Sequence, residues 1–405
     1  MIHAKYCKPR VFPWNSERAP EQIDRAQEIG GDLTLNRTKQ YEIGRDGVLG
    51  YKKDVPSFSY TMRQFEHGSM AFWRDIANFA DPASDGLDND VTLTDMQSTK
   101  FDIAAFLTDD DATFRGTIWF PKLRLSGFSI NIGDPDAIVE RNFTLVGEDY
   151  KMLDGKYFSY QTQTASGATE TVTLSPAAVE WASGDYIFRV LRIRAGVVSE
   201  LLEDTTSTYD ADSWRYTVGT VIVQTCSAGD VIKVFYPSST AYTTTWTDNN
   251  TDDDFLTADS CEIYIKHASS TRVYRLQSVG IDVSLDRADY KEIGNDEIVQ
   301  TGVKGKTVTV SLDRFAEDFA LEDILAHDTT YPYIDPRDFA EDIQMMVKVF
   351  SDKTHTMFKI GYLITSLSPT SVGASQPVED YHKRTAKLEA DNIKISDDES
   401  EIVFA

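Results

Sequence analysis

The sequence is poor in cysteine, in long apolar runs and in basic residues, and each shortage excludes a class of protein. Its 405 residues include only Cys7, Cys226 and Cys261, too few for a disulfide scaffold and without a Cys-x-x-Cys spacing. No apolar run approaches the ~18 residues of a membrane span, and the first residues lack the apolar stretch of a secretory signal. We therefore expect no membrane partner and synthesis in the cytoplasm. With 40 Lys and Arg against 65 Asp and Glu, the net charge of −25 argues against binding to nucleic-acid phosphates.

The motifs of catalysis and metal binding are also missing. None of the six histidines has a partner at metal-ligand spacing, and no Walker, Gly-x-Ser-x-Gly or dinucleotide-binding motif occurs. The acidic runs at 81–90, 109–111 and 252–254 lack the EF-hand spacing and predict solvated loops rather than Ca²⁺ sites. A carboxylate pair for glycoside hydrolysis stays open, because the separation of two carboxylates is a tertiary property. We expect no enzymatic activity, no cofactor and no metal.

The residues that are abundant predict a mainly β protein with sizeable cores. Hydrophobic residues make up 41% of the chain and aromatic residues 11%, and Thr, Tyr, Val and Ile recur in short alternating runs. A chain of 405 residues predicts two to three domains, since one domain usually takes about 100–200 residues.

Part of the sequence occurs twice. Residues 25–65 align without a gap on residues 275–315, with eleven identities that include Gly30, Asp32 and Phe65. A match of this length favours a duplicated domain over chance similarity between two β segments. With small deletions the repeat continues and aligns Phe106 with Phe350 and Phe114 with Phe358.

The repeat predicts three domains, because residues of about 150–255 have no counterpart. These are a first copy at 1–150, an inserted β-rich domain at 151–255 and a second copy at 256–405. The predicted fold class is mainly β (α+β). Each copy is a β-sandwich or barrel with one short helix, and the insert is a small β-sandwich, with strands expected in TETVTLS, YIFRVLRIRAG, WRYTVGTVIVQT and GDVIKVFYPSS.

Each copy contains two runs in which apolar residues alternate with Ser, Thr and Asp, as in TVTVSLD. This period of two predicts a sheet with one buried face and one wet face. The polar side chains predicted on the wet face are Asp32, Thr34, Asn36, Ser57, Ser59, Thr61, Arg63, Asp282, Ser284, Asp286, Thr307, Thr309, Ser311 and Asp313.

The two predicted strands of each copy are joined by a long segment, at 39–56 and 289–306, which we expect to be a loop that reaches a neighbouring molecule. A mobile surface loop is the alternative. The residues predicted to make such contacts are Tyr41, Glu42, Arg45, Asp46, Tyr51, Lys52, Lys291, Glu292, Asn295, Asp296 and Lys304.

A duplicated sheet of this kind fits a closed ring. Pairing between the sheets of neighbouring copies removes strand edges that would otherwise aggregate. The wet faces would then line a channel, and the long loops would contact the ring above or below. Three chains with two copies each would form a pseudo-sixfold ring.

The order of strand, long loop, strand and helix in EIGNDEIVQTGVKGKTVTVSLDRFAEDFALEDIL is repeated in EIGRDGVLGYKKDVPSFSYTMRQFEHGSMAFWRDI. It resembles the tail tube proteins of long-tailed phages and related viruses, in particular the type in which one polypeptide carries two tube domains. The insert, ending in AGDVIKVFY, looks like the β-rich modules that decorate such tubes, which are often terminal, whereas this one separates the copies.

The resemblance implies a structural protein of the virion tail. In that role homotrimeric rings stack into a tube around a tape-measure protein, with terminator and baseplate proteins as further partners. Double-stranded DNA passes through the tube without specific binding. Synthesis would take place in the host cytoplasm.

The charge of the predicted wet face fits such a conduit. Asp32, Asp282, Asp286 and Asp313 lie among hydroxyl side chains, with Arg63 as the exception, so we predict a negative channel that repels phosphates. Solubility or adaptation to a salty host would also explain the acidic composition. The alternative functions are a baseplate-hub or head–tail joining protein, which would form a single ring, and a β-rich adhesin that binds glycan through the insert.

Overall fold

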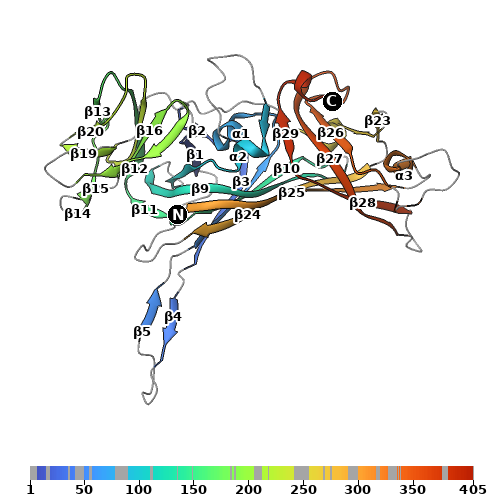
Figure 1. Ribbon diagram of the computed structural model, residues 1–405, viewed down its shortest axis with the longest axis horizontal. Coiled ribbons are helices and arrows are strands. Elements are labelled where there is room, and N and C mark those ends of the chain that lie inside the picture. Colours follow the sequence, from blue (N-terminus) through green and yellow to red (C-terminus); the bar gives the residue numbers. More distant parts are fainter. Residues whose placement is uncertain are drawn as a thin grey trace.

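The computed structural model is mainly β with a few short helices (Figure 1). It describes residues 7–404 except 15–18, 35–36, 42–49, 54–56, 78–89, 110–112, 135, 148, 183–184, 187, 205–211, 218, 241–254, 268–269, 274–275, 291–299, 316–319, 327–334, 336, 338 and 376–381. Among the helices of this described part, none has the length and apolar character to cross a membrane.

The first copy folds as two sheets packed against each other. Its inner sheet has the order β3 (Ala26–Thr34), β6 (Ser57–Phe65), β10 (Glu140–Gly147) and the second half of β9 (Phe114–Ile132). Its outer sheet has the order β2 (Glu21–Gln22), β1 (Lys8–Pro13), β8 (Phe101–Thr108), the first half of β9 and β11 (Lys151–Asp154). Strand β9 passes from one sheet to the other near Lys122, which has a left-handed φ of 53°.

The second copy repeats this arrangement. Its inner sheet has the order β24 (Leu276–Tyr290), β25 (Gln300–Phe315), β28 (Lys383–Ala390) and the second half of β27 (Phe358–Ser375). Its outer sheet has the order β23 (Ser270–Arg272), β22 (Cys261–Lys266), β26 (Ile343–Phe350), the first half of β27 and β29 (Ile393–Ser396). Strand β27 changes sheets next to Ser366, whose φ of 58° matches that of Lys122 in β9.

The backbone irregularities of the two copies fall at corresponding positions. Gln27 is bulged out of the β3–β6 pairing and Gln277 out of the β24–β25 pairing. Likewise, Ser126 is bulged out of the β9–β10 pairing and Thr370 out of the β27–β28 pairing. Bulges bend and twist a strand locally, so the shared positions give the two sheets the same shape.

One detail of the predicted alignment is wrong. Phe114 faces Thr108 across a hairpin, and Phe358 faces Phe350 in the corresponding hairpin. Phe114 and Phe358 therefore correspond, but the partner of Phe350 is Thr108 and not Phe106. The turn between the paired strands is longer in the second copy, and aromatic spacing along the sequence carries no information about turn length.

The two inner sheets join through β9 and β24 into one continuous sheet of eight strands. The two copies are also connected through the second copy's outer sheet. There β7 (Asp90–Thr92) of the first copy pairs with the edge strand β29 of the second copy. Helix α1 (Ala71–Ile76) and helix α3 (Ala320–Leu325) each follow the second inner strand of their copy, as predicted. A further short helix, α2 (Leu93–Met96), follows β7 and was not predicted.

The insert is a small sandwich of two four-stranded sheets, drawn in green at one end of Figure 1. Its sheets have the orders β12 (Tyr157–Thr164), β21 (Val231–Ser238), β16 (Arg189–Arg194), β17 (Val197–Glu200) and β13 (Thr169–Thr173), β20 (Thr220–Gln224), β19 (Ser213–Thr217), β18 (Leu202–Glu203). A two-stranded ribbon of β14 (Glu180–Ala182) and β15 (Asp185–Tyr186) completes it. The predicted strand runs of the insert coincide with β13, β16, β19, β20 and β21. The preceding strand β11, which falls in the predicted range of the insert, pairs with β9 of the first copy.

Where they are described, the segments predicted as long loops are mainly strands. In the first copy β4 (Arg37–Gln40) and β5 (Gly50–Lys53) pair as a ribbon that projects far from the sheets (Figure 1). In the second copy β24 and β25 stay paired as far as Tyr290 and Gln300. Pairing satisfies the backbone hydrogen bonds of a long excursion, which an open loop would leave to water.

Candidate functional site

The wet face of the eight-stranded inner sheet is the surface on which the predicted polar residues meet. Along β6, burial alternates at every position, with Phe58, Tyr60 and Met62 buried and the residues between them exposed. Residues directly opposite each other on paired strands share a face. The pairings place the following predicted residues on the wet face: Asp32, Thr34, Ser57, Ser59, Thr61, Arg63, Asp282, Ser284, Asp286, Thr307, Thr309, Ser311 and Asp313. Asn36 lies outside the described residues.

The other four strands of the sheet, β10, β9, β28 and β27, also contribute to this face, and none of their residues was predicted to lie on it. Asn142 and Thr144 of β10 and Thr385 of β28 extend the row of small polar side chains. Between the copies, the face is formed by Gly127 and Ser129 of β9, which lie opposite Ser284 and Asp282. Alternation of polar and apolar residues in RNFTLV and KRTAKLEA is the sequence signal for these faces. Because the two runs align only loosely with each other, their faces were not assigned from the sequence.

Carboxylates outnumber cations on this face. Among the described residues, the charged ones that the pairings place there are Glu28, Asp32, Arg63, Arg124, Glu140, Asp282, Asp286, Asp313, Lys383, Lys387 and Glu389. Arg63 forms an ion pair with Glu140 at 3.4 Å, and Ser278 donates a hydrogen bond to Asp313 at 3.0 Å. The two lysines come from β28 and make the second copy's share of the face less acidic than its predicted residues indicated.

The junction of the two copies shows how two such sheets pair. Strands β9 and β24 are antiparallel, with Asn131 opposite Gly280 and Gly127 opposite Ser284. The approach is close, since a Cβ atom on Gly127 would lie 2.4 Å from the carbonyl oxygen of Val283. The Nε–H of Arg287 also donates a hydrogen bond to the carbonyl oxygen of Leu125 at 2.7 Å.

The two outer edges of the eight-stranded sheet have no such partner in the described part of the chain. Strand β3 pairs only with β6, and residues 368–375 of β27 pair only with β28. Because β3 corresponds to β24 and β27 to β9, the unpaired edges are the same two edges that join in the middle of the chain. An open edge of this length is a template for pairing with another strand.

A buried polar cluster holds the first copy to the second behind the sheet. The Glu66 carboxylate accepts hydrogen bonds from the Tyr362 hydroxyl at 2.5 Å and from the backbone N–H of Gly68 at 2.8 Å. It also pairs with Arg141 at 3.3 Å, and neither charged side chain is exposed. Burial and the neighbouring carboxylate raise the pKa of Tyr362 well above its ordinary value, and burial, aided by Arg141, lowers the pKa of His67. This cluster fixes the two copies relative to each other.

Where they are described, the residues predicted to make ring contacts lie on the β4–β5 ribbon and on the β24–β25 hairpin. Tyr41 is 68% exposed beside β4. Tyr51 and Lys52 belong to β5 and Lys304 to β25, so these three are strand residues rather than loop residues. The other members of the predicted set, Glu42, Arg45, Asp46, Lys291, Glu292, Asn295 and Asp296, lie outside the described residues.

Side chains typical of metal or redox chemistry do not gather in the described part of the chain. No group of three or more His, Cys, Asp and Glu side chains there could hold a metal ion. The three cysteines are unpaired thiols. Burial raises the pKa of Cys7 to about 11 and that of Cys261 further, so both thiols stay protonated near neutral pH.

No protein-family model matches this chain, and no curated protein matches it.

Proposed function

We propose that three copies of this chain close into a ring and that these rings stack into the tail tube of a virus, through which double-stranded DNA passes. The β9–β24 junction carries the proposal. It joins two corresponding sheets edge to edge, and the same two edges, on β3 and β27, have no strand partner in the described part of the chain.

The junction supplies the register of the missing contact. Gly127 of β9 faces Ser284 of β24, and the corresponding pair is Ser371 of β27 and Thr34 of β3 in the next chain. Three chains joined in this way give a barrel of about 24 strands. With strands about 4.8 Å apart and tilted by about 40°, its backbone would be ~50 Å across. Small side chains on the inner wall leave room for a nucleic-acid duplex.

The surface chemistry agrees with a conduit rather than a binding site. Hydroxyl, amide and carboxylate groups hydrate well and project little, and a surface with more carboxylates than cations repels phosphates. The exposed ribbon of β4 and β5, far from the sheets, is suited to contact the adjacent ring (Figure 1). Tape-measure, terminator and baseplate proteins are the partners that such a tube requires.

Two double variants that place charges at Thr34 and Ser371, like charges in one and opposite charges in the other, test the ring contact. Thr34 and Ser371 are both exposed, so Thr34→Asp with Ser371→Asp should leave the monomer's melting curve unchanged. In the ring the two carboxylates would face each other, and like charges opposite each other cost ~0.2–1 kcal/mol at each contact. Each chain makes one such contact in the ring, so we expect the protein concentration needed for tube formation to rise by up to about fivefold, and Thr34→Lys with Ser371→Asp to restore it.

Negative-stain electron microscopy of the purified protein gives the readout. Long tubes of uniform diameter agree with the proposal, and single rings point instead to a hub or joining protein of the same fold. The proposal would be contradicted by monomers at every concentration, or by tubes that both double variants form at the same protein concentration.

A further inference from the structure

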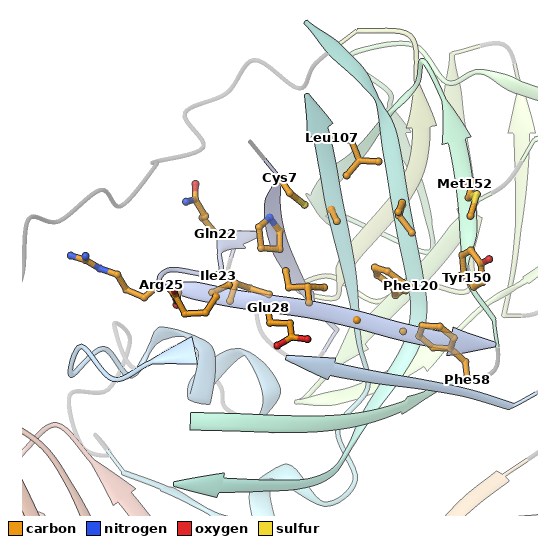
Figure 2. Close-up of a pocket in the computed structure, with 18 residues that line it drawn as sticks. Cys7, Gln22, Ile23, Arg25, Glu28, Phe58, Leu107, Phe120, Tyr150 and Met152 are labelled. Carbon is orange, nitrogen blue, oxygen red and sulfur yellow. The ribbon is translucent and has the colours of Figure 1, made fainter. Parts of the chain in front are cut away.

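The first copy contains an open cavity of about 570 Å³ between its two sheets, beside strand β3, whose outer edge has no strand partner in the described part of the chain (Figure 2). Leu107, Phe120 and Tyr150 point into it from the outer-sheet side, and Phe58 of β6 closes one end. Met152 of β11 stands at its rim and is 62% exposed. Most of the lining is apolar, and an apolar cavity open to water is unfavourable unless something fills it.

In the second copy most of the corresponding space is filled. Tyr362 and Ile364 stand where Ile118 and Phe120 stand in the first copy, and Ile395 stands where Met152 does. All three second-copy residues are completely buried. The corresponding second-copy cavity, beside β24, has only about 200 Å³.

The filling comes from the first copy, from the segment between β6 and β8. Its strand β7 pairs with β29, with Val91 opposite Ile395. The next residues, in α2, carry Leu93 and Met96, both completely buried in the shared core. Polar contacts hold the segment in place, among them a bond from Arg287 of β24 to the carbonyl oxygen of Gln97 at 2.8 Å.

We infer that the first-copy cavity is the docking site for a second copy of this chain, which inserts the corresponding segment of its own second copy. By the alignment of the two copies, that segment lies between Leu325 of α3 and Ile343 of β26. Its sequence carries Tyr331, Tyr333 and Ile334, which have the apolar and aromatic character of the cavity lining.

The inference rests on the proposed ring and adds a second contact to it. In the intramolecular junction, the copy that provides the strand β9 also provides the inserted segment. The neighbour that pairs its β27 with β3 would therefore also fill the cavity beside β3, which continues the same interface. Every copy in the ring would then have a closed core.

Cross-linking between two singly substituted proteins tests the inference. One protein carries Met152→Cys and the other Tyr333→Cys, and equal amounts are mixed and treated with a short bismaleimide. We expect a cross-linked dimer of the two proteins, because the inserted segment would reach the rim of the cavity. Met152→Cys alone, and Val197→Cys mixed with Tyr333→Cys, are the controls, since Val197 is 66% exposed on the insert, away from the cavity.

A second variant tests the energetics. Met152→Asp places a charge at the cavity rim and should weaken association at least tenfold in sedimentation, whereas Val197→Asp should not. The two outcomes separate the inference from the proposed function. Tubes without the Met152–Tyr333 cross-link, or with unchanged association of Met152→Asp, overturn the docking site alone. Cross-linked dimers or rings that never form tubes uphold the docking site and overturn the tube.

Discussion

The outer sheets of the two copies are covered by different parts of the chain, although the inner sheets of the two copies have β-bulges at corresponding positions. The insert covers the first copy's outer sheet, where Phe12 and Trp119 pack against Phe158 with ring centroids 4.8 and 4.6 Å apart. The second copy's outer sheet is covered by the end of the chain, where the buried Ile402 packs against Met346 and Leu363.

The difference lies in the size of the side chains rather than in the backbone. Trp119 and Leu363 occupy corresponding positions in β9 and β27, and Ala104 and Met346 do so in β8 and β26. A broad aromatic surface suits a whole domain as its cover, and a smaller aliphatic surface suits a short segment. The outer faces can differ between the copies because each needs only its own cover. The inner faces share one surface and one geometry.

The first copy's outer face also has a polar centre that the second lacks. The Asp102 carboxylate is fully buried and accepts hydrogen bonds from the indole N–H groups of Trp14 at 2.9 Å and Trp119 at 2.8 Å. Arg189 of the insert pairs with it at 3.3 Å and lies over the Trp14 ring. At the corresponding bulge in β26 the second copy has Gln344, which is only half-buried.

Of the variants that compare the two outer faces, removal of this polar centre should cause the largest loss in the free energy of unfolding. Asp102→Ala leaves two buried indole N–H groups without their acceptor and leaves the Arg189 guanidinium with Glu200 as its remaining carboxylate partner. Breaking one side of a buried ion pair costs about 3–5 kcal/mol. We expect urea denaturation to show a loss of this size in the free energy of unfolding. Gln344→Ala is the matched control and should cost less than about 1 kcal/mol, and equal losses for the two variants would contradict the assigned role of Asp102.

The second copy's cover should depend on one apolar side chain. Ile402→Ala removes buried methyl groups above Met346 and Leu363, which costs about 2–4 kcal/mol in a core. Thermal unfolding should report this loss. Val403→Ala, at a neighbouring side chain that is 53% exposed, should stay within about 0.5 kcal/mol of the unchanged protein. A loss from Ile402→Ala as small as that expected from Val403→Ala would mean that the buried side chain of Ile402 does not hold this cover in place.

The sequence predicted the sheet faces well and the contacts between distant elements poorly. The faces of β6 and β24 are readable because a strand has a period of two, so each side chain's side follows from its neighbours. Arg141 shows the limit. Arg141 is a charged residue between polar neighbours in β10 and yet is completely buried, because Glu66, which follows the end of β6, supplies its counter-charge. Such a pairing depends on which strands become neighbours.

The cavity and the two covers were beyond prediction for a related reason. Their existence depends on the distance between two sheets and on which segment lies above them. Nothing in the alternation around Ile118 or Met152 distinguishes them from their filled counterparts Tyr362 and Ile395. The repeat itself becomes informative only when the two copies are compared in space.

The smallest expected effect concerns the insert itself and separates its own stability from its docking on the first copy. Asp230 accepts hydrogen bonds from Arg194, at 2.7 Å for the shortest, and from the backbone N–H of Ser227 at 2.8 Å. The bonds from Arg194 hold the pKa of Asp230 below its ordinary value. A carboxyl with a lowered folded-state pKa stabilises the fold above its unfolded pKa, near 3.9, and loses this contribution as the pH falls through the folded value.

Asp230→Asn should therefore destabilise the insert at pH 7, and the difference from the unchanged protein should shrink as the pH falls below about 4. Circular dichroism melts across this range give the measurement. Asp212→Asn is the control, because Asp212 also pairs with an arginine of β16, Arg192, but its side chain is 56% exposed and screened by solvent. If the Asp230→Asn difference stayed constant with pH, the carboxylate charge would not be what holds this turn. If Asp230→Asn also released the insert from the first copy, the docking centred on Asp102 would depend on the insert's internal stability.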